Sequence, residues 1–286
     1  MDFLIEGFMK VHLAQMKPIL GNLEKNAENH FKIIEQAVEE GCDLVVFPEL
    51  SLTGYYLLDL VYDVAMDETH PVYQRFLEYS NDIAIVFGFV YESKEKLFYN
   101  AASFVHRGKT VHLHRKVYLP DYTLFEEGRY FAAGNSIEAF DTEFGKCGIL
   151  VCEDVFHLSS LYILSQSGVQ NIIIPSNSPA RGNLEEGHEA SNTWQTSNRY
   201  IAGVLTVNLV FVNRVGVEDG VSFWGGSEAY NARGNRLVAA EMFKETGISV
   251  AMELDSVRRA RIETPFLRDE KSFLVRNFLN EDGGRQ

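Results

Sequence analysis

The chain of 286 residues is 46% hydrophobic and 23% charged, which is ordinary for a soluble globular protein. Its formal net charge of -14 excludes nucleic acid and anionic membrane surfaces as expected partners, because both would repel an acidic chain. The length suits one large α/β domain or two smaller ones. No fixed-period repeat, low-complexity segment or linker divides the sequence, so we expect a single domain over residues 1–286.

Cysteine and histidine usage gives no sign of a disulfide framework or a metal centre. The three cysteines (Cys42, Cys147 and Cys152) are too few for a stapled fold, and no Cys-x-x-Cys pair occurs. The eight histidines lack metal-ligand spacing. His112 and His114 alternate on one face of a predicted strand and are expected to be packing or surface side chains. We therefore expect no metal and no cofactor.

Targeting and membrane signals are weak. The N-terminal segment carries acids early and lacks a small-residue cleavage signature, so it is a poor signal peptide. The most apolar stretch, residues 200–212, is interrupted by Thr206 and Asn208 and is too short to span a bilayer. We expect a cytoplasmic protein with no membrane partner.

The first predicted elements form a βαβ unit. Residues 10–16 read as a strand, and residues 43–47 read as a second, buried strand. Between them an amphipathic helix is predicted, with Gly41 as its stop. Its apolar residues recur at helical spacing, at Ala27, Phe31, Ile34 and Val38.

The rest of the chain alternates strands, helices and hairpins. The elements that we expect, in chain order, are a strand at 83–91, a hairpin of 97–106 with 109–116, a hairpin within 136–152, a helix at 158–168, a strand at 171–175, a helix at 185–203, a strand at 206–216, a hairpin at 221–240, a strand at 247–254, and a final helix with a polar tail. Because hairpins interrupt the βα alternation, we expect an α/β fold with mixed sheets packed by helices.

Three chemically able residues share one kind of location. Glu49, Lys116 and Cys152 each lie at or just past the C-terminal end of a predicted strand, where α/β sheets build their sites. If the strands are neighbours, Glu49 would accept the thiol proton of Cys152, while Lys116 would favour the thiolate and steady a tetrahedral intermediate. The backbone amide of Glu153 would be a second oxyanion donor, with the Glu153 and Asp154 side chains turned away.

Each of these residues also has a simpler interpretation. Cys152 follows four apolar residues and taken alone is more often an inert core thiol. Glu49 would serve as an acid at a helix N-terminus, and Lys116 beside Arg115 as part of a solvated basic face. The pattern alone does not bring the three strands together.

In three motifs the chain resembles the nitrilase superfamily of carbon–nitrogen hydrolases. The motifs are "DLVVFPELSLTGY" around Glu49, "HRKVYLP" around Lys116 and "GILVCED" around Cys152, and they occur in the order typical of that superfamily. The likeness runs from about Val11 to about Asp255, nearly the whole chain. It implies a Glu–Lys–Cys triad and an α-β-β-α sandwich of mixed sheets covered by helices.

Within the superfamily, the chain is most similar to the glutaminase domain of glutamine-dependent NAD synthetases, through "LTGYYLLDL", "KVYLPDYTLFEEGRYF", "CED" and "NSPARG". The resemblance implies that Glu49 is the base, Lys116 the oxyanion partner and Cys152 the nucleophile, and that Glu127 is a further acid that positions substrate. It also implies a substrate pocket lined by Tyr55, Tyr122, Glu153 and Ser178.

The sequence departs from that branch in two respects. No "SGGxDS" pyrophosphatase loop occurs, so self-contained NAD synthesis is not expected of these residues. The segment "ARGNLEEGHEA" is largely acidic where the branch usually carries basic residues, and Arg181 alone is at hand for a free α-carboxylate.

We therefore expect a thiol-dependent amidase that hydrolyses a small linear amide, glutamine-like or another ω-amide, through a thioester with release of ammonia. The alternatives are a glutaminase subunit that supplies ammonia to a separate synthetase, an N-carbamoyl or nitrile hydrolase, and, least favoured, a non-catalytic scaffold. By resemblance we expect a homodimer or higher homo-oligomer, with the tail from about residue 256 in the interface.

Overall fold

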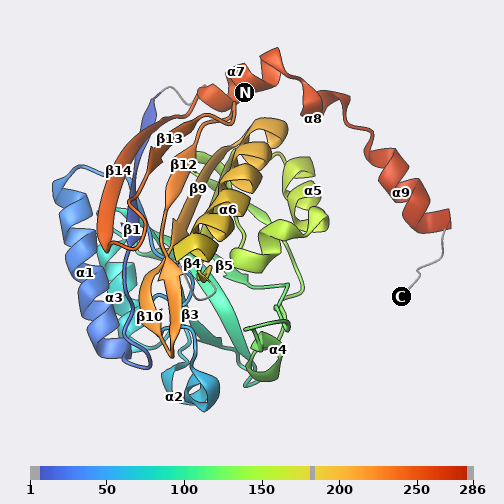
Figure 1. Ribbon diagram of the computed structural model, residues 1–286. Coiled ribbons are helices and arrows are strands. Elements are labelled where there is room, and N and C mark those ends of the chain that lie inside the picture. Colours follow the sequence, from blue (N-terminus) through green and yellow to red (C-terminus); the bar gives the residue numbers. More distant parts are fainter. Residues whose placement is uncertain (1–6, 181–183, 282–286) are drawn as a thin grey trace.

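The computed structural model describes residues 7–180 and 184–281, and its centre consists of two six-stranded sheets (Figure 1). The first sheet has the order β14-β1-β2-β3-β4-β5. Strands β1, β2 and β3 run parallel and the other neighbours are antiparallel, so the sheet is mixed. Its strands are β1 (Phe8–Gln15), β2 (Leu44–Val46), β3 (Ala84–Glu92), β4 (Phe98–His106), β5 (Lys109–Arg115) and β14 (Thr246–Glu253).

The second sheet has the order β13-β12-β9-β8-β7-β6. Here β7, β8 and β9 are parallel and the outer pairs are antiparallel, so this sheet repeats the mixed plan of the first. Its strands are β6 (Ala139–Thr142), β7 (Gly145–Ile149), β8 (Asn171–Ser176), β9 (Asn208–Asn213), β12 (Glu228–Tyr230) and β13 (Arg236–Ala239).

Helices cover the outer face of each sheet and produce four layers. Helices α1 (Leu23–Glu39) and α3 (Pro71–Tyr79) pack on the first sheet, and α5 (Leu158–Gln166) and α6 (Leu184–Leu205) pack on the second. The inner faces of the sheets meet in a third apolar core, whose buried members include Val11, Leu13, Ile149, Ile173 and Val212. The layers confirm the expected α-β-β-α sandwich.

The N-terminal βαβ unit is confirmed in detail. Of the apolar positions of α1 that the spacing predicts, Ala27, Phe31 and Ile34 are buried against the first sheet, whereas Val38 is exposed. Asn22 begins the helix by accepting a hydrogen bond from the Lys25 N–H. Gly41 follows the C-cap with φ of +69°, the left-handed conformation that glycine adopts without strain.

The prediction of one hairpin over residues 221–240 is wrong. The chain leaves the second sheet after β9, and β10 (Val215–Glu218) pairs with β11 (Val221–Trp224) in a separate two-stranded ribbon. Gly225 and Gly226, at φ of +71° and +62°, then turn the chain back so that β12 pairs with both β9 and β13. Helix α3 was not predicted, nor were four short elements: the 3₁₀ helix η1 (Leu58–Leu60), α2 (Val61–Val64), α4 (Glu127–Tyr130) and the 3₁₀ helix η2 (Cys152–Phe156).

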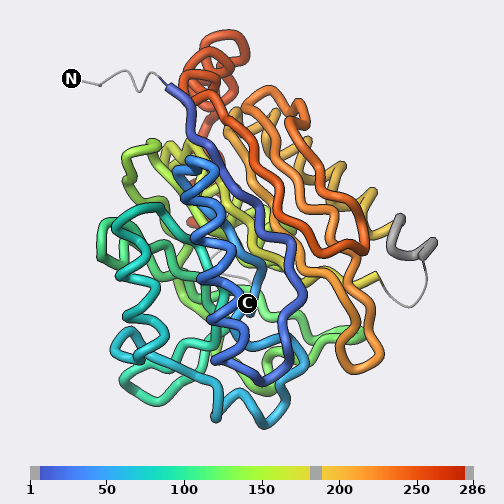
Figure 2. The backbone as a smooth tube through the Cα atoms, turned by 90° about the vertical axis from the view of Figure 1, so that its left-hand side faces the viewer, coloured from blue at the N-terminus to red at the C-terminus, as the bar shows by residue number. Residues whose placement is uncertain are grey.

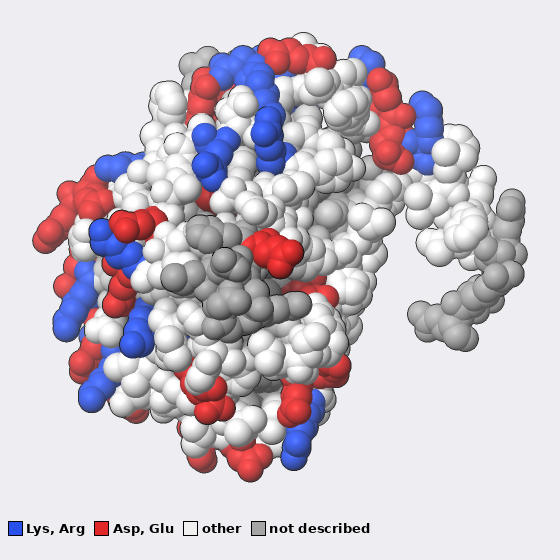
Figure 3. Space-filling model, in the orientation of Figure 1, with Lys and Arg blue, Asp and Glu red and all other residues white. Residues whose placement is uncertain are grey.

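The C-terminal residues form an arm that leaves the body. Helices α7 (Ser256–Glu263) and α8 (Phe266–Asp269) lead to α9 (Ser272–Glu281), which extends away from the sandwich (Figure 1). A groove of about 820 Å³ lies between α5, the end of α6, α8 and α9, and Figure 3 shows a largely uncharged surface there. The exposed apolar residues of α9 are Phe273, Leu274, Val275, Phe278 and Leu279.

The first and last strands lie side by side at the edge of the first sheet. Figure 2 shows β1 and β14 adjacent, and their antiparallel register aligns His12 with Ser249. Among the described residues, no helix combines the length and the apolar character needed to cross a membrane.

Candidate active site

The structure brings Glu49 and Lys116 together at the C-terminal ends of two strands of the first sheet. Glu49 lies three residues beyond β2 and Lys116 directly follows β5. Lys116 Nζ donates to Glu49 Oε1 at 2.7 Å, and both side chains are fully buried. Cys152 lies three residues beyond β7 of the second sheet. The site is therefore assembled from loops at the C-terminal strand ends of both sheets.

Glu49 is held by a close approach of backbone segments. Asn100 Nδ2 donates to Oε1 at 2.8 Å, and the Asn177 N–H donates to Oε2 at 2.8 Å. The next residue, Leu50, has φ of +43°, which is uncommon for a residue with a side chain. Gly88 in β3 makes room for this turn, because a Cβ atom there would lie 2.5 Å from the Leu50 nitrogen.

Lys116 bridges two carboxylates. Its Nζ atom also donates to Glu127 Oε1 at 2.7 Å, and that oxygen accepts the Tyr55 hydroxyl at 2.6 Å. Burial alone would lower the pKa of Lys116, yet the negative charges of Glu127 and Glu49 hold it well above its ordinary value. Burial raises the pKa of Glu127 to about 7, against the opposing effect of Lys116. Glu127 Oε2 is buried and has no partner among the described residues.

The surroundings of Cys152 favour the neutral form of its thiol. Cys152 begins η2 with φ of +46°, and its Sγ atom accepts the Ser176 hydroxyl at 3.3 Å. Burial, followed by the negative charge of Glu49, raises the pKa of Cys152 far above its usual range, and Lys116 lowers it only in part. Lys116 favours the thiolate, as expected, but burial and the charge of Glu49 outweigh it.

Asp154 fastens the loop of Lys116 to the turn of Cys152. Its Oδ1 atom accepts the N–H groups of Val117 and Tyr118 at 3.0 and 2.9 Å. Its Oδ2 atom accepts the Val151 N–H at 3.0 Å and lies 2.7 Å from His114 Nε2. Although burial opposes it, the hydrogen bond from His114 keeps the pKa of Asp154 lowered. His114 was predicted to be a packing or surface residue, and the structure instead gives it this buried charge-assisted contact.

A cavity of about 710 Å³ opens beside Cys152. Of the predicted substrate-binding residues, Tyr122, Glu153 and Ser178 line it. Tyr55 instead lines an adjacent cavity of about 200 Å³ together with Glu127, on the other side of residues 123–124. Arg181 lies outside the described residues.

Ser178 presents a hydroxyl with a defined polarity. Its Oγ atom accepts the indole N–H groups of Trp194 and Trp224 at 2.9 and 3.1 Å. Two acceptor positions of a serine hydroxyl are thereby used, so its remaining capacity is to donate a proton. Ser178 is thus suited to an acceptor atom of a bound molecule.

An ion pair that sequence reasoning missed supports Tyr55. Glu218 Oε1 accepts the N–H groups of Tyr55 and Tyr56 at 2.7 and 2.8 Å. Arg214 Nη1 donates to Glu218 Oε2 at 2.6 Å, and the guanidinium lies 4.3 Å from the centre of the Phe223 ring. The ribbon β10–β11 therefore supports the loop that places Tyr55 against Glu127.

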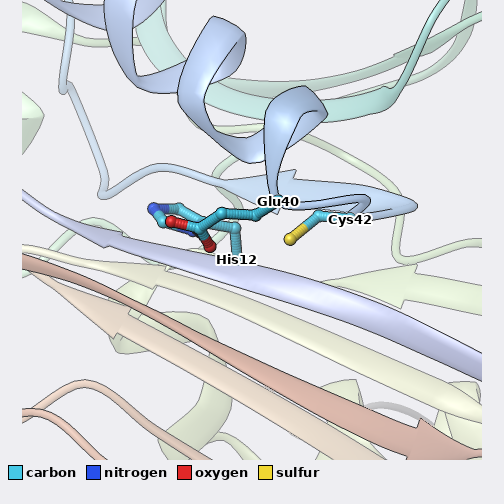
Figure 4. Close-up of side chains that lie close together, drawn as sticks. All are labelled: His12, Glu40 and Cys42. Carbon is cyan, nitrogen blue, oxygen red and sulfur yellow. Dashed lines mark ion pairs between the residues drawn. The ribbon is translucent and has the colours of Figure 1, made fainter.

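One cluster in the described part of the chain has donors that a metal could use. His12, Glu40 and Cys42 converge at the end of α1, with one ligand atom of each within 4.8 Å of the others (Figure 4). The Ser249 hydroxyl donates to Glu40 Oε2 at 2.7 Å and lies 3.0 Å from His12 Nδ1 and 3.5 Å from Cys42 Sγ. Because one hydroxyl satisfies all three groups, we assign the cluster to a hydrogen-bond network at the sheet edge.

Similarity to known proteins covers most of the chain. Residues 10–262 match the family model described as Carbon-nitrogen hydrolase. The chain belongs to the carbon–nitrogen hydrolase family. The sequence-based assignment to this superfamily is thereby confirmed, as is the expectation of an enzyme acting on carbon–nitrogen bonds.

Relatives of this carbon–nitrogen hydrolase include long and short proteins. It is 30% identical over 254 residues to a glutamine-dependent NAD(+) synthetase of Acinetobacter baylyi. This alignment covers 89% of this chain and 46% of the relative. A probable nitrilase of Schizosaccharomyces pombe is 27% identical over 266 residues, with 88% and 92% covered. The chain thus spans about half the length of the synthetases that it matches.

Solved structures agree with these matches. A glutamine-dependent NAD+ synthetase of Acinetobacter baumannii in complex with ADP has a TM-score of 0.77 at 30% identity, covering 88% of this chain and 47% of that one. A carbon–nitrogen hydrolase of Helicobacter pylori G27 has a TM-score of 0.86 at 25% identity, covering 98% and 99%.

Proposed function

We propose that this carbon–nitrogen hydrolase is a cysteine-dependent amidase that converts a small linear amide to its acid and ammonia. The observation that carries the proposal is the buried contact of Lys116 with both Glu49 and Glu127, at 2.7 Å each, near enough to Cys152 for all three charges to act on the pKa of its thiol. An ammonium between two carboxylates next to a thiol provides a base, a fixed positive charge and a nucleophile.

In the first half-reaction, Cys152 is the nucleophile and Glu49 the base. Glu49 takes the thiol proton while the sulfur forms a bond to the amide carbon. The oxyanion that develops is stabilised by the Lys116 ammonium and the Glu153 backbone N–H. Glu49 then gives the proton to the departing nitrogen, the carbon–nitrogen bond breaks, and ammonia leaves a thioester on Cys152.

In the second half-reaction, water releases the acid. Glu49 takes a proton from water as its oxygen attacks the thioester carbon, and the carbon–sulfur bond then breaks. The sulfur takes up the proton again, which restores the thiol. Because the pKa of Cys152 is raised, return to the neutral thiol is favourable.

Two side chains are suited to hold the amide. The unpartnered Oε2 atom of Glu127 would accept an N–H of the amide, and the Ser178 hydroxyl would donate to an acceptor on the remainder of the substrate. Glu153 and Tyr122 would contact the same remainder from the opposite wall of the cavity. These contacts give the proposed roles of the residues that line the cavity.

The synthetase relatives favour a second candidate. They are named glutamine-dependent, which supports a glutaminase subunit that passes ammonia to a synthetase. On that reading, ammonia release would be slow alone and would rise when the partner is added. Unchanged turnover on mixing would contradict it. N-carbamoyl compounds and nitriles remain alternative substrates.

We also propose a homodimer built around the C-terminal arm. The groove beside α5 and α6 and the exposed apolar residues of α9 form an uncovered apolar surface. A second copy placed across this surface would cover both.

Ammonia release from a panel of amides, N-carbamoyl compounds and nitriles tests the proposed reaction, with Cys152→Ala measured in parallel. Amides should be hydrolysed by the wild type, with activity lost in the variant. A wild type that is silent on the whole panel, or a variant that matches it, contradicts the proposal. Cys42→Ala is the matched control, because that thiol lies in the network with Ser249.

A further inference from the structure

The cavity beside Cys152 has an acidic lining. Among the described residues that line it, the charged ones are Glu153 and Glu189, both carboxylates. Glu153 stands next to the nucleophile in η2, and Glu189 comes from α6. Two negative charges from different elements thus face the cavity beside Cys152.

Glu153 is a fixed charge. Its Oε2 atom accepts the Tyr122 hydroxyl at 2.8 Å, its Oε1 atom lies 3.5 Å from His157 Nε2, and its side chain is 16% exposed. A carboxylate that is oriented in this way is ready to receive a donor without reorganisation.

Glu189 belongs to a continuous helical face. The residues of α6 that line the cavity are Glu189, Ala190, Thr193 and Trp194, which recur at helical spacing on one side. Glu189 is exposed, and no described side chain is paired with its carboxylate. Its charge is therefore available to a molecule in the cavity.

In the described part of the chain, no side chain that lines the cavity is cationic. The Lys116 ammonium is shared between Glu49 and Glu127. The aromatic residues Phe125, Phe156 and Trp194 also line the cavity, and aromatic rings add a second attraction for a cation. Carboxylates and aromatic rings together are the chemistry that recognises a protonated amine.

We infer that the preferred substrate is a cationic amide, whose carbon chain carries a protonated amine distal to the scissile amide. This rests on the proposed amidase function and narrows its substrate class. The amine stays on the acyl group when ammonia leaves, so Glu153 and Glu189 hold it through both half-reactions. A carboxylate in the same position would be repelled by both side chains.

Three amides of matched length test the substrate class. δ-Aminovaleramide, hexanamide and adipamate have the same methylene spacer between the amide and the terminal group. That terminal group is an ammonium, a methyl and a carboxylate, respectively. We expect kcat/KM to be about tenfold higher for the cationic amide than for hexanamide, and about tenfold lower for the anionic one. Equal values for the three, with activity that depends on Cys152, would overturn this inference and leave the amidase proposal standing.

Thiol modification tests the charge of the cavity without hydrolysis. We expect the cationic reagent aminoethyl methanethiosulfonate to modify Cys152 at least about tenfold faster than the anionic sulfonatoethyl reagent, with peptide mass spectrometry identifying the site. Glu189→Gln should lower this ratio about threefold, and Glu241→Gln on an exposed turn should not. No discrimination between the reagents would refute the acidic pocket. If the two reagents differ in rate but none of the three amides is hydrolysed, the acidic cavity stands and the amidase proposal is contradicted instead.

Discussion

Replacing Gly88 by alanine should displace the proposed base through its backbone and leave its side chain unaltered. A Cβ atom at Gly88 would lie 2.5 Å from the Leu50 nitrogen, 2.6 Å from the Pro48 oxygen and 2.9 Å from the Glu49 carbonyl carbon. These atoms belong to backbone and cannot rotate away, so the segment that carries Glu49 has to move by about half an ångström to one ångström to restore normal contacts. A misplacement of about 1 Å in a catalytic group costs about a hundredfold in rate.

The assay is kcat/KM for ammonia release, together with the midpoint of thermal unfolding. Gly88→Ala should lose about a hundredfold in kcat/KM while the protein remains folded at the assay temperature. Gly203→Ala is the matched control, because a Cβ atom there would meet nothing closer than 3.6 Å and alanine suits the interior of α6. If both variants keep wild-type kcat/KM, the close packing of β3 against the Glu49 turn does not position the base.

Three further predictions concern charged residues of the site. Glu127→Gln should remove a pH dependence of the free energy of unfolding. The pKa of Glu127 is about 7 in the folded protein against an ordinary value near 4.5, so its contribution to stability is full below pH 4.5 and is lost as the pH rises through 7. Urea unfolding should therefore show the wild type losing about 2.5 kcal/mol more than the variant between about pH 5 and pH 8. Parallel curves would contradict this. Asp154→Asn should lower the free energy of unfolding by about 3 kcal/mol in the same assay, because the amide presents a donor toward the Val151 N–H; an unchanged value would show that the fastening is weak. Glu49→Gln should lower kcat by about a thousandfold in single-turnover measurements, and retained turnover would exclude Glu49 as base.

The sequence predicts the location of the site better than its electrostatics. Glu49, Lys116 and Cys152 were placed at strand ends from hydrophobic runs alone, because short apolar strands are local patterns that end where polar residues begin. The pKa values of the site residues could not be predicted in this way. They depend on burial and on the approach of Glu127 to Lys116, and neither is visible in a sequence pattern. For this reason the sequence predicts the effect of Lys116 on the Cys152 thiol but not the larger, opposing effect of burial.

Partnerships between distant segments were also beyond the sequence. Asp154 reads as an acid beside a cysteine, yet its partners are at His114, Val117 and Tyr118, almost forty residues earlier. The ribbon β10–β11 was missed because the strand break at the single residue Arg214 leaves no mark in the hydrophobic pattern. One signal was available: Gly88 interrupts an otherwise bulky strand, which indicates a close backbone approach.

The site spans two sheets, and catalysis therefore depends on how they are aligned. Glu49 and Lys116 move with the first sheet and Cys152 with the second, while Asp154 and the core between the sheets set their relative position. An expanded state that keeps its strands but loosens that core would separate nucleophile from base. On gentle heating or acidification, turnover should consequently disappear before the far-ultraviolet circular dichroism changes. Turnover therefore reports on the packing between the two sheets.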